Sequence, residues 1–137
     1  MSNIISFETA VKLKEAGFPQ PVPQVGQVWY GLIRGYSEIN MIVSVKDKDI
    51  FIDIHWNHHL QEAFDKFGTY APTVGDLLKE LPDWELSYAP AILRSIVPSI
   101  NPFVISNYDY DDMEKRSFSG DSAVDACAIA YLKLKTT

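Results

Sequence analysis

The sequence contains little of what several classes of protein require. It has a single cysteine, Cys127, which excludes an internal disulfide bond and a zinc site built from four cysteines. No run approaches the roughly 20 consecutive apolar residues of a membrane-spanning helix, so we expect no membrane partner. Residues 1–15 have no positively charged segment followed by an apolar one, so we expect no signal peptide. Together these absences predict a cytoplasmic protein.

Basic residues are fewer than acidic ones and are scattered along the chain. The sequence holds 12 Lys and Arg against 18 Asp and Glu, which gives a formal net charge of -6. Phosphate backbones are bound by clustered Lys and Arg, so we expect no long nucleic acid as a partner. An acidic surface attracts basic ones, and we therefore expect a basic protein partner. A homo-oligomer also stays open.

The composition is typical of one globular domain. The hydrophobic share is 47% and the charged share is 22% over 137 residues, and we predict a single domain over residues 1–137. Capping residues followed by helical spacing of apolar side chains predict three helices. These helices are 7–16 after Ser6, 74–81 after Thr73, and one that begins at Ser122.

Runs rich in Val, Ile, Trp and Tyr predict strands at 27–34, 39–46, 50–56, 84–88 and 103–108. Short turn-like segments join the first three, which indicates an antiparallel meander. The stretch 91–97 between prolines is ambiguous, and the acidic run 109–114 predicts a solvated loop before the last helix. We therefore predict an α+β fold in which a mostly antiparallel sheet is covered by helices on one face.

All three histidines fall within five residues, as His55, His58 and His59, and Glu62 follows three residues later. We predict that Asn57 caps a short helix that ends at Gly68. On that helix His58 and Glu62 would lie one turn apart, and His59 and Glu62 would also be neighbours. His55, at the end of the preceding strand, could converge on them. Two or three ring nitrogens and a carboxylate oxygen suit zinc, iron or another divalent transition metal.

The metal hypothesis has an alternative, in which the histidines are solvated or cap backbone groups at a polar strand-to-helix junction. The pattern is not the His-Glu-x-x-His of metalloproteases, because His58 and His59 are adjacent and would diverge by about 100° on a helix. Cys127 lies within an Ala-rich helical face and reads as a small buried side chain, not as a nucleophile. The sequence offers no catalytic residue, and whether the chain is an enzyme stays open.

Two segments resemble those of a known group of proteins. Residues 70–82 read Tyr-Ala-Pro-Thr-Val-Gly-Asp-Leu-Leu-Lys-Glu-Leu-Pro. They resemble the aPT-x-x-(D/E)-LL-x-x-LP block of small uncharacterised phage and prophage proteins. Residues 118–134 are similar to the capped Ala/Leu helix that ends those proteins. The resemblance implies a small cytoplasmic accessory protein of a mobile element, aimed at host machinery, and carries no activity or catalytic residue.

Three functions follow from these observations. The first is non-catalytic binding of a host or viral protein, in which surface Tyr and Trp residues act as anchors. The second is a metal-binding domain or metal-dependent hydrolase centred on His55, His58, His59 and Glu62. The third is binding of a small nucleotide-like ligand, which requires a basic or aromatic-lined pocket.

Overall fold

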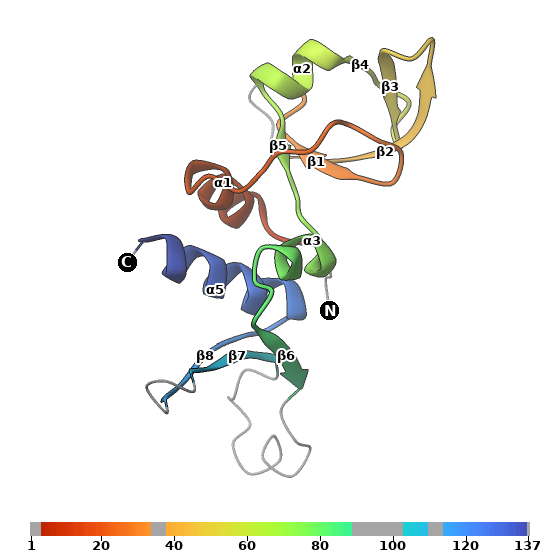
Figure 1. Cartoon of the computed structure of the whole chain (residues 1–137). Coiled ribbons are helices and arrows are strands. Elements are labelled where there is room, and N and C mark those ends of the chain that lie inside the picture. The colour runs from red at the N-terminus through yellow and green to blue at the C-terminus, as the bar shows by residue number, and fades with distance from the viewer. Residues whose placement is uncertain (1–3, 34–37, 89–102, 110–113, 137) are drawn as a thin grey trace. The chain divides into compact units, whose positions relative to one another are not determined.

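A computed structural model describes residues 4–33, 38–88, 103–109 and 114–136 of the chain. Contacts between residues divide the chain into two compact units. Figure 1 labels the helices and strands of both units. The N-terminal unit is Ser6–Ala71, and the C-terminal unit is Met1–Ile5 with Pro72–Thr137. The predicted α+β class is confirmed, since helices accompany strands that pair antiparallel. The expectation of one domain over residues 1–137 stays a prediction.

The strands form two sheets, where the sequence analysis predicted one. In the N-terminal unit five strands follow the order β4-β3-β2-β1-β5. The meander of the first three is confirmed, because β2 pairs antiparallel with both β1 and β3. The strands are β1 (Val28–Tyr30), β2 (Ile39–Lys46), β3 (Ile50–Asp53), β4 (His58–Leu60) and β5 (Thr69–Tyr70).

The first helix, α1 (Phe7–Glu15), forms where the capping pattern predicts it. The Ser6 hydroxyl accepts a hydrogen bond from the Thr9 backbone N–H at 3.2 Å, which satisfies one of the free donors of the first turn. Gly17 follows the helix with a φ of 94°, a conformation that glycine adopts without strain.

An aromatic cluster forms the core of the N-terminal unit. Phe64, on helix α2 (Gln61–Lys66), meets the Trp29 ring at 5.0 Å between centroids and the Phe51 ring at 5.1 Å. Tyr70 lies 5.4 Å from Trp29. These edge and tilted contacts bring together β1, β3, β5 and α2, and they decide which face of β3 is buried.

The segment after Asn57 contradicts the sequence prediction of a helix. Residues His58–Leu60 form strand β4, in which Ile52 is opposite His58 and Phe51 is opposite His59. The helix begins only at Gln61. Pairing with β3 supplies ladder hydrogen bonds that a helix starting at His58 would forfeit. The strand predicted at 50–56 also ends earlier, at Asp53, because the chain turns back there.

The C-terminal unit begins with a capping box. The Thr73 hydroxyl accepts from the Asp76 backbone N–H at 3.2 Å, and the Asp76 carboxylate accepts from the Thr73 N–H at 3.0 Å. The helix that follows, α3 (Val74–Lys79), confirms the prediction. The second sheet has the order β6-β7-β8, formed by β6 (Glu85–Tyr88), β7 (Phe103–Asp109) and β8 (Glu114–Gly120).

Strand β8 was not predicted from the sequence. Its residues, Glu-Lys-Arg-Ser-Phe-Ser-Gly, are mostly polar and lack the β-branched residues that favour strands. They form a strand because β7 pairs with them along its length. Asp109 and Glu114, the two ends of the loop predicted at 109–114, belong instead to β7 and β8. Three other expectations lie wholly or largely outside the described residues. They are the turn-like segment between the strands predicted at 27–34 and 39–46, the stretch 91–97 and the centre of the acidic run.

The last helix, α5 (Ala123–Thr136), packs on β7, β8 and α3 (Figure 1). Its cap is the predicted one, since the Ser122 hydroxyl accepts from the Asp125 N–H at 3.2 Å. Cys127 is fully buried, and burial raises the pKa of its thiol to about 11. Thiolate is the reactive form of cysteine, so the structure supports a packing role for this residue. No helix in the described part of the chain is long and apolar enough to cross a membrane.

Two glycine-to-alanine substitutions in the C-terminal unit should have opposite effects on stability. A Cβ at Gly120 would lie 2.6 Å from the Ala126 backbone nitrogen, whereas one at Gly75, inside α3, meets nothing closer than 3.7 Å. We expect Gly120→Ala to lower the free energy of unfolding by about 1–3 kcal/mol. Gly75→Ala should raise it by about 0.5 kcal/mol. Urea unfolding measures both, and equal effects would contradict this account of α5 packing.

Candidate functional site

The carboxylate of Asp53 lies at the end of β3 and is completely buried. One oxygen, Oδ2, accepts from Asn40 Nδ2 at 2.9 Å and lies 2.8 Å from His59 Nε2. The other, Oδ1, accepts from the backbone N–H groups of His55 at 2.8 Å and Asn57 at 3.0 Å. One side chain therefore ties together β2, the β3–β4 turn and β4.

These contacts keep Asp53 ionised. Burial raises the pKa of the carboxyl group, but hydrogen bonds from His59, Asn57 and His55 and the charge interaction with His59 lower it by more. The pKa of Asp53 therefore lies below its ordinary value of 3.8. An ionised carboxylate has no proton to donate, so His59 Nε2 carries the hydrogen of their shared bond.

The β3–β4 turn places an exposed tryptophan in an unusual backbone conformation. The Trp56 N–H donates to the Asp53 carbonyl at 2.9 Å, and the Asp53 N–H donates to the Asn57 carbonyl at 3.0 Å. The three residues Ile54, His55 and Trp56 thus form the loop of the hairpin. The last position of such a loop is left-handed and usually occupied by glycine. Trp56 has a φ of 66° there, and the residue is 77% exposed.

A hollow of about 500 Å³ runs along β4. It is bordered by all four residues from Asn57 to Leu60, although successive residues of a strand point to opposite faces. The hollow therefore follows the edge of the strand and not one face. Its other walls come from α2 and from the segment after β1; they are Glu62, Ala63, Lys66 and Phe67, with Leu32 and Ile33.

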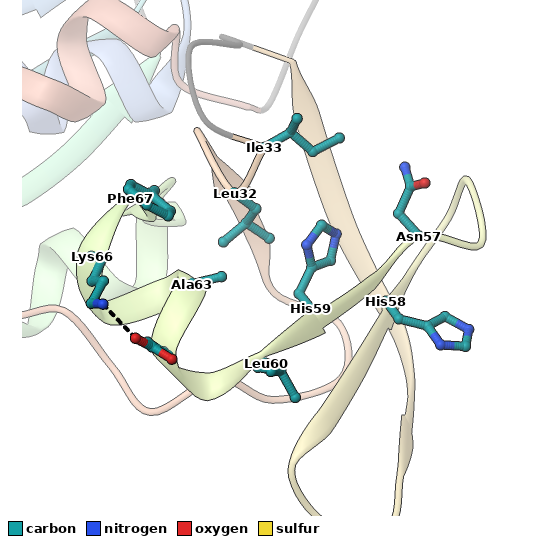
Figure 2. A pocket seen from close by; sticks show the side chains of 10 residues that line it. Leu32, Ile33, Asn57, His58, His59, Leu60, Ala63, Lys66 and Phe67 are labelled. Atoms are coloured by element: carbon teal, nitrogen blue, oxygen red, sulfur yellow. Dashed lines mark hydrogen bonds and ion pairs between the residues drawn. The ribbon is translucent and has the colours of Figure 1, made fainter.

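The His59 ring has one nitrogen open to this hollow. In Figure 2 the ring points from β4 toward Leu32 and Ile33. No described residue hydrogen-bonds to its second nitrogen, Nδ1, although the residue is only 6% exposed. Within the described part of the protein every fully buried side-chain nitrogen or oxygen has a partner. Nδ1 is therefore reached from the hollow, where it accepts a hydrogen bond if the ring is neutral and donates one if the ring is protonated.

The structure separates the residues predicted to bind a metal. His58 and His59 project to opposite faces of β4, so that His58 is exposed and His59 is buried (Figure 2). His55 is exposed in the turn, and Glu62 forms an ion pair with Lys66. The helix that would align His58 with Glu62 does not exist. Among the described residues, no group of three or more His, Cys, Asp or Glu could hold a metal ion. The metal assignment stays a prediction.

The described residues also give no support to the hypothesis that the chain binds a nucleotide-like ligand. Lys66 is the only Lys or Arg among the residues that border the hollow, and the Glu62 carboxylate pairs with it. The hollow therefore presents no free cation for a phosphate group among its described lining residues.

Asn40, which completes the network around Asp53, was not among the residues predicted from the sequence. The signal was present, since an amide interrupts the apolar run Ile-Asn-Met-Ile-Val at 39–43. Asn40 is 1% exposed and pairs across the sheet with Trp29. A polar side chain within a buried strand requires a hydrogen-bond partner, which could have been sought in Asp53 on the next strand.

Removing the Asp53 carboxylate should destabilise the protein strongly. Asp53→Ala leaves two side-chain donors and two backbone donors without their acceptor. We expect the free energy of unfolding to fall by about 3 kcal/mol or more. His55→Ala is the matched control, because His55 contributes only its backbone N–H; it should change the value by less than about 0.5 kcal/mol. Similar losses in urea unfolding of both variants would contradict the network.

The Asp53 carboxylate should also make stability depend on acid pH. Its pKa is lowered in the folded state, so it stabilises the fold above the ordinary value of 3.8. That contribution is lost as the pH falls below 3.8 and through the lower folded-state pKa. We expect urea midpoints of the wild type to fall more steeply between pH 5 and pH 2 than those of Asp53→Asn, which cannot titrate there. Parallel curves would show that Asp53 does not carry this dependence.

Comparisons with known proteins give no family for this chain. No family model, curated protein or solved structure matches it. The features that bear on function are therefore Asp53 with its hydrogen bonds, Trp56 and the hollow along β4.

Proposed function

We propose that this chain is a non-catalytic protein-binding module and that Trp56 is its main anchor. The observation that carries the proposal is the exposure of Trp56, 77%, in a left-handed conformation with a φ of 66°. Bulky residues rarely adopt that conformation, and glycine fits it without strain. An exposed indole adds little to the core, so the fold does not require a tryptophan at this position.

Tryptophan is the type of residue that contributes most to protein interfaces. It buries a large apolar area when a partner covers it and loses little conformational entropy. The buried Asp53 carboxylate accepts from the backbone N–H groups on both sides of Trp56, those of His55 and Asn57. The turn is therefore held in one conformation before a partner binds, which lowers the entropic cost of association.

Other apolar side chains accompany Trp56 on the N-terminal unit. Ile54 in the same turn is 52% exposed, and Leu60 at the end of β4 is 54% exposed. All large hydrophobic residues found exposed in the described part of the chain belong to this unit. They are Val22, Val25, Ile39, Val43, Val45, Ile54, Trp56, Leu60 and Phe67. This distribution supports an interaction surface on the N-terminal unit.

The nature of the partner is inferred from charge and from the sequence resemblance. A net charge of -6 favours a basic protein surface through electrostatic steering and disfavours long nucleic acids. The blocks at 70–82 and 118–134, which resemble segments of phage and prophage proteins, support a cytoplasmic accessory role for a mobile element. The partner would then be a protein of the bacterial host or of the virus.

Replacing Trp56 should separate binding from stability. We expect Trp56→Gly to leave the free energy of unfolding unchanged or higher, because it relieves backbone strain. The same substitution should weaken partner binding by about 30-fold or more, as for an interface anchor. Immobilised wild-type protein, Trp56→Gly and the control Val22→Ser, at a residue 71% exposed, would be incubated with bacterial lysate. Retained proteins are then quantified by mass spectrometry.

The proposal requires proteins that the wild type and Val22→Ser retain and that Trp56→Gly loses. Equal retention by all three would contradict it. A loss of stability above about 1 kcal/mol in Trp56→Gly would also contradict it, because Trp56 would then have a structural role.

A further inference from the structure

Strand β4 is an edge strand whose outer backbone groups have no partner among the described strands. It is the first strand in the order β4-β3-β2-β1-β5. Asp53 and Asn57 form a hydrogen-bonded pair, because the Asp53 N–H donates to the Asn57 carbonyl. Hydrogen-bonded and non-hydrogen-bonded pairs alternate along an antiparallel ladder. The backbone groups of His59 therefore face β3, and those of His58 and Leu60 point away from it.

Two further observations point to an occupant of this edge. The hollow of about 500 Å³ runs beside it and gives space for side chains of an added strand. His59 Nδ1 opens into that hollow and has no partner among the described residues. The His59 residue as a whole is only 6% exposed. A hydroxyl group of a ligand in the hollow would reach Nδ1 and hydrogen-bond to it, as the donor to a neutral ring or as the acceptor from a protonated one.

We propose that an extended segment of the partner protein binds along β4 as an additional antiparallel strand. The N–H and carbonyl groups of His58 pair with one residue of the segment, and the Leu60 N–H pairs with another two positions away. The Leu60 carbonyl does not pair with the added segment, because Leu60 is the N-cap of α2 and its carbonyl accepts the first hydrogen bond of that helix. This binding mode, addition of a strand to an open edge, deepens the proposed function and rests on it.

The geometry also predicts which side chain the segment carries. The residue opposite His59 points to the same face of the sheet as the His59 ring, toward Leu32 and Ile33. It enters the hollow, where it meets apolar walls and His59 Nδ1. Tyr and Thr provide both an apolar body and a hydroxyl that can donate to Nδ1 or accept from it. Glu62 and Lys66 at the rim neutralise each other, so the hollow itself does not select for charge.

The test selects binders from a synthetic library of random nonapeptides on the immobilised full chain. Affinities of the selected peptides are then measured by fluorescence anisotropy for the wild type and three variants. His58→Pro removes the outward N–H, a change that edge strands tolerate because the β3 ladder does not use it. His58→Thr is the matched control and keeps that N–H. His59→Gln keeps a donor for Asp53 and removes Nδ1.

We expect selected peptides with Tyr or Thr at a fixed position. Their affinity should fall at least tenfold in His58→Pro, fall roughly three- to tenfold in His59→Gln, and stay unchanged in His58→Thr. Amide hydrogen exchange in the wild type gives a second measurement that needs no variant. The His58 and Leu60 amides should be protected when peptide is bound.

The proposal is overturned if no peptide is selected, if His58→Pro and His58→Thr bind equally well, or if the two amides stay unprotected. Failure of this binding mode is distinguishable from failure of the proposed function. If only the strand-addition mode fails, capture of lysate proteins still depends on Trp56. If the proposed function fails, that dependence on Trp56 is absent.

Discussion

The structure of the N-terminal unit depends on one buried carboxylate. Asp53 accepts hydrogen bonds from Asn40 on β2, from His59 on β4 and from two backbone groups of the β3–β4 turn. The same contacts fix the path of the turn, the conformation of Trp56 and the orientation of the His59 ring. If the carboxylate were absent, the buried side-chain donors of Asn40 and His59 would lack an acceptor, the turn would lose two hydrogen bonds, and each of these features would lose its support.

This arrangement contains one feature that stability alone does not favour. A tryptophan, exposed to solvent, occupies a backbone conformation suited to glycine. Proteins retain such costly features mainly where they contribute to function. Trp56 directly precedes Asn57, which borders the hollow along β4, and β4 is an edge strand among the described strands. This proximity is the physical basis for proposing that the surface binds a partner.

Local interactions explain which parts of the fold could be predicted. The caps at Ser6, Thr73 and Ser122 act within three residues of sequence, so the starts of α1, α3 and α5 follow from the sequence. Strands β4 and β8 were missed, because pairing with β3 and β7 outweighs the weak strand propensity of their residues. The predicted helix at His58 failed for the same reason, and with it the proposed alignment of His58 with Glu62.

In the candidate site, too, some features follow from the local sequence and others only from tertiary contacts. By itself the sequence determined the α+β class, the capped helices, the acidic charge and the cluster of histidines around 55–59. Phe51 and Asp53 share one face of β3 because side chains alternate along a strand, and tertiary packing of Phe64 against Phe51 decided that this face is buried. The partners of Asp53, the exposure of Trp56 and the hollow beside β4 were likewise decided by contacts between strands and helix. Such contacts join residues that the local pattern of a sequence does not connect, because burial is a property of the assembled fold.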